Sequence, residues 1–173
     1  MGETSYTLES DEKATQVMIG TPDMLVWGHL VTKEQIQIVA FLNTLAEDFV
    51  PLHDASILFL APTRRVAPIE KPRIFVKLEE ILLFYSMSEE PPLPEESEVR
   101  QYEPVEALVG SFRIEGDILK SPIATLQNLL LVTKDSYLPL YQATIRHVAN
   151  SWLGAFSSTM VHVRRARLTM TTG

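Results

Sequence analysis

The side chains best suited to chemistry lie near the C-terminus, where basic residues accumulate and acidic residues stop. After Asp135 the chain contains no aspartate or glutamate. Arginine binds phosphate strongly and often through two parallel hydrogen bonds. The segment therefore predicts a site for a phosphate-containing ligand or nucleic acid, to which Arg64 and Arg65 of an earlier loop could add. The candidate ligand-binding residues are Arg146, His147, His162, Arg164, Arg165 and Arg167.

The histidines offer a weaker case for catalysis or metal binding. His53 and Asp54 are neighbours in an expected strand, so their side chains should point to opposite faces and cannot form a base and its orienting carboxylate. His147 and His162 lie on adjacent expected strands and could meet, but no histidine pair has metal-ligand spacing. We therefore predict no catalytic residue, no metal and no cofactor.

Composition sets further limits on function. The net charge is −7, which argues against a dedicated nucleic-acid binder. The chain has no cysteine, so disulfides and thiolate metal sites are excluded and a reducing cytoplasm is the expected compartment. No apolar run approaches the roughly 20 residues that a membrane-spanning helix needs, so no membrane association is predicted.

An internal repeat organises the chain. Residues 28–57 align without a gap on residues 116–145. Upstream the alignment suggests a two-residue insertion before Gly28, and downstream a one-residue shift places residues 74–81 on residues 161–168. We interpret the repeat as a tandem duplication. The identical pairs are Gly28/Gly116, Leu42/Leu130, Pro51/Pro139, Leu52/Leu140, Ala55/Ala143 and Ile57/Ile145.

The repeat and the composition together predict the domain organisation. Residues 1–12 are polar and should form a disordered N-terminus. Residues 13–86 form the first repeat and residues 105–173 the second. Between them, residues 87–104 are acidic and rich in proline, and such a segment cannot bury enough apolar surface to order itself, so we expect an exposed linker.

Each repeat is expected to fold as strand, short helix, strand, strand. Thr32 should cap the first helix, while Ser121 caps the second and Pro122 occupies its first turn. Each helix should end before the proline that the two repeats share, Pro51 in the first and Pro139 in the second.

In the second repeat, apolar residues at steps of three and four predict that one helix face is apolar. That face comprises Ile123, Leu126, Leu129, Leu130 and Thr133.

In the strand after Pro51, simple alternation puts Leu52, Asp54 and Ser56 on one face. Ala55 and Ala143 should lie where another backbone approaches closely. The predicted fold is α+β and mostly β, with two β-α-β-β repeats packed by pseudo-twofold symmetry into a barrel or sandwich. Two independent small barrels are the alternative.

The repeated segments "AFLNTLAEDFVPLHDASI" and "NLLLVTKDSYLPLYQATI" resemble a pattern of small bacterial β-rich domains, L-N followed by F-x-P-L-x-D-A. In the second copy Leu131 replaces Asn43 and Gln142 replaces Asp54. The layout is also loosely similar to Sm-like barrels. The resemblance implies an architecture and supplies no activity.

Three functional hypotheses follow, in this order. The first is a non-enzymatic binding or regulatory module that contacts a protein partner or forms a homo-oligomer. The second is a receptor for a phosphate-containing ligand or nucleic acid through the C-terminal arginines. The alternative explanation of these arginines is that they form ion pairs with the acidic linker or with Glu79 and Glu80. The third is a hydrolase-type enzyme.

Overall fold

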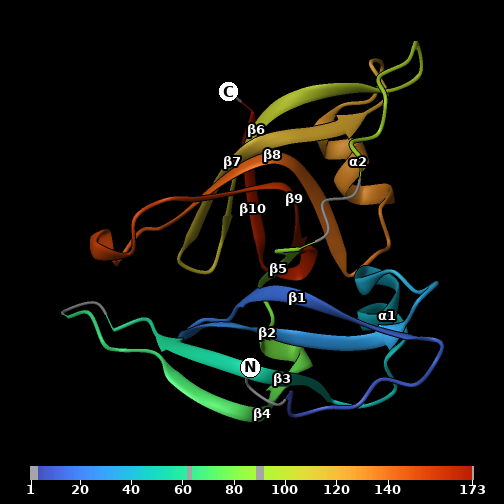
Figure 1. The fold of residues 1–173 in the computed structure, drawn as a ribbon. Coiled ribbons are helices and arrows are strands. Elements are labelled where there is room, and N and C mark those ends of the chain that lie inside the picture. Colours follow the sequence, from blue (N-terminus) through green and yellow to red (C-terminus); the bar gives the residue numbers. More distant parts are fainter. Residues whose placement is uncertain (1–3, 62–63, 89–91, 173) are drawn as a thin grey trace. The chain divides into compact units, whose positions relative to one another are not determined.

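The computed structural model describes residues 4–61, 64–88 and 92–172. The chain divides into two compact units, residues 1–89 and residues 90–173. In the described residues each unit contains five strands and one α-helix of seven residues (Figure 1). The prediction of a mostly β protein of the α+β kind is thus confirmed.

The first unit is an antiparallel sheet with the strand order β5-β1-β2-β3-β4. A short helix, α1, interrupts the chain between β2 and β3, and a single 3-10 turn joins β4 to β5. In chain order the elements are β1 (Glu12–Gly20), β2 (Met24–Lys33), α1 (Ile38–Thr44), β3 (Phe49–Phe59), β4 (Ile69–Lys77), η1 (Leu78–Glu80) and β5 (Leu83–Ser86).

The second unit has the corresponding strand order, β10-β6-β7-β8-β9. Its helix lies between the second and third strands, as in the first unit, and a 3-10 turn again joins the fourth strand to the fifth. The elements are β6 (Gln101–Val109), β7 (Phe112–Lys120), α2 (Leu126–Val132), β8 (Tyr137–His147), η2 (Ser151–Leu153), β9 (Phe156–Arg164), η3 (Arg165–Arg167) and β10 (Leu168–Thr172).

The expected order β-α-β-β is therefore wrong, because each unit is β-β-α-β-β-β. The run before each helix was expected to be a single strand, but it forms a hairpin of two strands, β1 with β2 and β6 with β7. In the second unit Gly110 has a φ of 58°, the left-handed conformation that a tight turn between β6 and β7 requires. At the other end, η1 and η3 break what looked like one continuous final strand.

A β-bulge occurs at the same place in both units and explains why the two repeats share a glycine and an alanine there. In β3, Trp27 faces Ser56 but His29 faces His53, so β3 carries one extra residue opposite β2. The extra residue, Asp54, has a φ of 46°. Because the bulge resets the alternation, Leu52 and Ala55 are both buried, and our assignment of faces by simple alternation is wrong.

The equivalent bulge in the second unit is at Gln142, whose φ is 48°. Opposite each bulge lies a glycine. A Cβ atom on Gly28 would stand 2.9 Å from the Ala55 Cβ, and one on Gly116 would stand 2.8 Å from the Tyr141 carbonyl oxygen. The prediction of a close backbone approach at these alanines is confirmed, and it is the reason why glycine faces them.

Strand registers also decide how the two units correspond. Val17 pairs with Gly28, and Val105 pairs with Gly116, so the first two strands of each unit match at the offset that relates Gly28 to Gly116. The predicted two-residue insertion before Gly28 is therefore wrong. The one-residue shift downstream agrees with the registers, since Leu52 pairs with Ile74 and Leu140 with Val161.

Helix capping differs from expectation in both units. Thr32 is buried within β2, and the residue before α1 is Gln37, which makes no side-chain cap bond. In the second unit Thr125, not Ser121, caps the helix by accepting a hydrogen bond from the Asn128 backbone N–H at 3.1 Å. Both helices end well before the prolines.

Pro51 and Pro139 lie inside strands, where they face Phe75 and His162 of the next strand. They therefore belong to the sheet, and the helices end for another reason: the residues after α1 and α2, Leu45 and Thr133, already have extended backbone conformations.

The segments outside the predicted repeats also make contacts. The Ser5 N–H lies 3.2 Å from an Asp54 carboxylate oxygen, within the stretch that we expected to be disordered; residues 1–3 are outside the described part. In the predicted linker, the Tyr102 hydroxyl donates to the Pro94 carbonyl at 2.5 Å, and the end of that linker already belongs to β6. Residues 89–91 are likewise not described.

Candidate functional site

The predicted basic set does not form one site. Tyr137 at the start of β8 pairs with Arg164 at the end of β9, whereas Ile145 pairs with Phe156 at the start of β9. Arg146 and Arg164 therefore lie at opposite ends of this strand pair, roughly 30 Å apart at about 3.3 Å per residue. The structure groups His162, Arg164, Arg165 and Arg167 near one end, and Arg146 with His147 at the other.

Arg164 and Arg165 are held by contacts within the second unit. The Arg164 guanidinium donates a hydrogen bond to the Tyr137 hydroxyl at 2.7 Å and lies 5.0 Å from the centre of that ring. Arg165 donates to the carbonyls of Asp135 at 3.2 Å and Leu130 at 3.5 Å. Arg165 thus satisfies carbonyl groups at the end of α2 and after it, which is a structural task.

The histidines of the set are partly or fully buried in the second unit. The His147 Nδ1 atom lies 2.9 Å from the Asn150 side-chain nitrogen, its ring packs edge-on against Phe112, and burial lowers its pKa. Burial lowers the pKa of His162 to about 4. His162 faces Pro139, far along β8 from His147, so these two histidines do not meet.

Arg146 is exposed and weakly paired, since one guanidinium nitrogen lies 3.5 Å from a Glu115 carboxylate oxygen. Arg113 on the neighbouring strand also contacts Glu115, at 3.0 Å. This end of the second unit therefore balances its arginines with glutamate and has little charge left for an anionic ligand.

In the first unit the structure brings two histidines together. His29 and His53 face one another across β2 and β3, and the Tyr6 ring lies 5.8 Å from the first ring and 5.1 Å from the second. Burial lowers the pKa of His53, Arg73 adds to that effect and Asp54 opposes it. Sequence reasoning missed this cluster, because Tyr6 lies in the stretch expected to be disordered.

The cluster lacks the contacts of a catalytic or metal centre. The Nδ1 atoms of His29 and His53 are buried and have no hydrogen-bond partner. Across residues 4–61, 64–88 and 92–172, no group of three or more histidine, aspartate and glutamate side chains is arranged to hold a metal ion.

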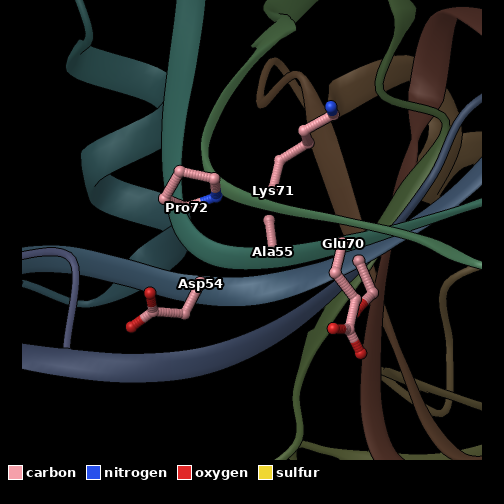
Figure 2. A pocket seen from close by; sticks show the side chains of 6 residues that line it. Asp54, Ala55, Glu70, Lys71 and Pro72 are labelled. Atoms are coloured by element: carbon pink, nitrogen blue, oxygen red, sulfur yellow. The ribbon is translucent and has the colours of Figure 1, made fainter. Parts of the chain in front are cut away.

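A shallow cavity of about 320 Å³ lies beside the bulge, between β3 and β4. Figure 2 shows that Glu70 and Lys71 point in opposite directions, as neighbours in a strand must, so they do not converge on a common point. The cavity therefore has charged walls, but the charges of Glu70 and Lys71 are directed apart. Its lining residues are Asp54, Ala55, Ser56, Glu70, Lys71 and Pro72.

The most unusual surface belongs to α2. All seven residues of this helix are described and none is buried. On the predicted apolar face, Leu126, Leu129, Leu130 and Thr133 are half-buried, whereas Ile123 is exposed. Ile123 is 95% exposed, Leu131 72% and Val132 70%. We call these three residues the α2 surface. Helices on a protein surface normally carry charged residues on their outer side.

The sequence contained a signal for this surface that we did not use. Residues 121–133 include no charged residue at all, although the chain as a whole is 21% charged. An amphipathic pattern indicates which residues share a face, but it cannot say whether another element covers that face.

Comparisons with models of known protein families, with curated proteins and with solved structures found no match. No helix in the described part of the chain has the length and apolar character needed to cross a membrane.

Proposed function

We propose that this protein is a non-enzymatic interaction module that associates with a second copy of itself through the α2 surface. The observation that carries the proposal is the combination of high exposure and missing charge: Ile123, Leu131 and Val132 are largely exposed within a segment that has no ionisable side chain. Leu131 and Val132 lie at the end of α2 and Ile123 precedes the helix. Exposed apolar side chains in a segment without charge are typical of a surface that a partner covers.

A second copy is the occupant best matched to this face. The chain carries a net charge of −7, so most of its surface repels another copy. The α2 segment is neutral, and two such faces can pack about a twofold axis without bringing like charges together. The α2 segment is therefore a place where self-association meets little electrostatic opposition.

The size of the patch predicts a weak complex. Burying one Ile, Leu or Val side chain contributes about 1.5–3 kcal/mol, and a twofold interface uses each residue twice. Association costs about 4–15 kcal/mol in lost freedom of motion. Because this cost offsets most of the energy gained by burial, we expect a weak complex, with a dissociation constant on the order of 10 μM to 1 mM.

We also propose that the chain arose by tandem duplication and that each unit curls toward a small barrel. The corresponding strand orders, the two bulges with positive φ at Asp54 and Gln142, and the glycines that face them support the duplication. In each unit four strands form an antiparallel meander and the fifth strand returns to pair with the first. A bulge in the third strand bends the sheet strongly there, which supports a curled sheet.

Analytical ultracentrifugation of the whole chain at 10 μM to 1 mM tests the self-association. The test variant is Ile123→Gln, Leu131→Asn and Val132→Thr together, because the first unit carries Gln35, Asn43 and Thr44 at the equivalent positions. We expect concentration-dependent dimerisation of the wild type and a monomeric variant.

The matched control removes exposed apolar groups elsewhere: Val99→Thr with Val148→Thr, two other exposed valines. This control should dimerise like the wild type. A wild type that remains monomeric at 1 mM, or a test variant that still dimerises, would contradict the proposal.

A further inference from the structure

Positive charge is concentrated along one edge of the first unit. Between positions 64 and 77 the chain has five basic residues and a single acidic one, Glu70, although its net charge is −7. The segment comprises the end of the β3–β4 loop and the whole of β4, which is the last strand in the order of its sheet. We call Arg64, Arg65, Lys71, Arg73, Phe75 and Lys77 the β4 edge.

Most of this charge is not neutralised. Within residues 4–61, 64–88 and 92–172, Arg64, Arg65, Lys71 and Arg73 form no ion pair, and only Lys77 pairs with a carboxylate, that of Glu79. All five basic side chains belong to exposed residues. Because Glu70 points away from Lys71 (Figure 2), its carboxylate does not cancel that charge.

Aromatic rings are interleaved with these charges. Phe75 is 59% exposed, and the Arg73 guanidinium lies 4.8 Å from the centre of its ring. Phe49 of β3, also exposed, faces Lys77. A large aromatic side chain left in water between cations has no packing role in the sheet, but it offers a flat surface on which a base can stack.

The second unit shows that the fold does not require this edge. The residues that face Ala143, Tyr141 and Pro139 are Ser158, Met160 and His162, whereas Lys71, Arg73 and Phe75 face the corresponding Ala55, His53 and Pro51. The same strand position therefore tolerates uncharged side chains, and the basic residues of β4 need an explanation outside the strand itself.

We propose that the β4 edge binds single-stranded nucleic acid, with the basic side chains contacting phosphates and Phe75, aided by Arg73, stacking on an unpaired base. Phosphate contacts supply sequence-independent affinity, and stacking on an aromatic ring favours a single strand because its bases are accessible. An acidic protein would use the cations but would gain little from the exposed ring. This site is separate from the α2 surface and does not depend on self-association.

Fluorescence anisotropy with a labelled 15-nucleotide oligouridine at 50 mM salt tests the proposal on the whole chain. We expect binding that weakens steeply with salt, and weaker binding of a duplex of equal length. Lys71→Ser with Arg73→Met, the residues found in β9, should reduce the salt slope by about 1.4, since each phosphate contact on a single strand contributes roughly 0.7. Phe75→Leu should weaken binding at least about 5-fold.

Two controls make the outcome decisive. Arg113→Gln with Arg146→Gln removes the same charge from the second unit and should leave binding unchanged. If the β4 variants fail to fold, as judged by circular dichroism, Arg64→Gln with Arg65→Gln in the exposed loop replaces them and should also reduce the slope. The proposal would be overturned if the wild type did not bind the oligouridine at 50 mM salt. It would also be overturned if the Arg113/Arg146 variant lost as much binding as the Lys71/Arg73 variant, or if a polyglutamate peptide competed as well as unlabelled oligouridine.

Discussion

α1 and α2 occupy the same place in their units, between the second and third strands, yet their exposed faces are chemically different. Where α1 and its approach present Gln35, Asn43 and Thr44, α2 presents Ile123, Leu131 and Val132. Among the fourth strands it is the first unit that has the unusual surface, because β4 is basic whereas β9 has few charges.

The residues that do not differ are those that build the sheet. Leu52 and Leu140 are both fully buried, and Ala55 and Ala143 both face a glycine across the bulge. The comparison shows that the same arrangement of strands carries two unrelated surfaces, an apolar helix in one unit and a basic edge in the other. Each difference between equivalent positions is therefore a natural choice of substitution.

The largest expected effect is on the shared core. Leu52→Ala and Leu140→Ala should each lower the free energy of unfolding of their unit by about 2–5 kcal/mol, because each removes a fully buried side chain and leaves a cavity. Urea unfolding followed by circular dichroism measures this loss. If one of the two substitutions costs less than about 1 kcal/mol, the equivalence of the two cores is refuted.

The next effect concerns pH. Because burial lowers the pKa of folded His162 to about 4, the unfolded chain binds more protons between pH 4 and about 6.5. The free energy of unfolding should therefore fall by about 3 kcal/mol as the pH decreases from about 6.5 to 4. Below pH 4, His162 should cause no further decrease. His162→Phe, which introduces the residue of the first unit, should remove that dependence in urea titrations at pH 4 and pH 7. A pH dependence equal to that of the wild type would show that His162 is not buried.

The bulge glycines come third. Gly28→Ala places a Cβ atom 2.9 Å from the His53 carbonyl oxygen, and Gly116→Ala places one 2.8 Å from the Tyr141 carbonyl oxygen. Neither carbonyl can move without disturbing the bulge, so each substitution should destabilise its unit by about 1–3 kcal/mol. Thermal unfolding measures both losses, and a neutral result for either glycine would mean that its bulge is not tightly packed.

The smallest effect separates the two helix starts. Thr125→Ala removes a side-chain cap and should cost about 1 kcal/mol, whereas Gln37→Ala removes no cap bond and should cost much less. Hydrogen exchange at the Asn128 amide reports the local loss. Equal effects of the two substitutions would contradict the difference in capping.

The sequence predicted the mostly β fold well because strand formation depends largely on local residue preferences. Identical glycines, alanines and prolines marked equivalent positions, and β-branched residues marked strands. The position of the extra residue in β3 and β8 escaped prediction because Asp54 and Gln142 look like ordinary strand residues, and only the register reveals their positive φ. Without the bulge, the faces after Leu52 were assigned the wrong way.

The candidate sites were predicted less well than the fold. The C-terminal arginines looked like one cluster because strand direction separates them only after the register is known. The β4 edge was hidden by the negative net charge, which averages over the chain and says nothing about where five cations gather. Burial of a helix face depends on what covers it, and no local pattern contains that information.

The central claim is that equivalent strand arrangements carry different surfaces in the two units. The most direct test is to move the exposed apolar residues from the α2 segment to the α1 segment. A chain with Ile123→Gln, Leu131→Asn and Val132→Thr, together with Gln35→Ile, Asn43→Leu and Thr44→Val, exchanges the exposed residues of α1 and α2. Analytical ultracentrifugation should show that dimerisation, lost when α2 alone is changed, returns in the exchanged chain. A folded exchanged chain that stays monomeric at 1 mM would contradict the account.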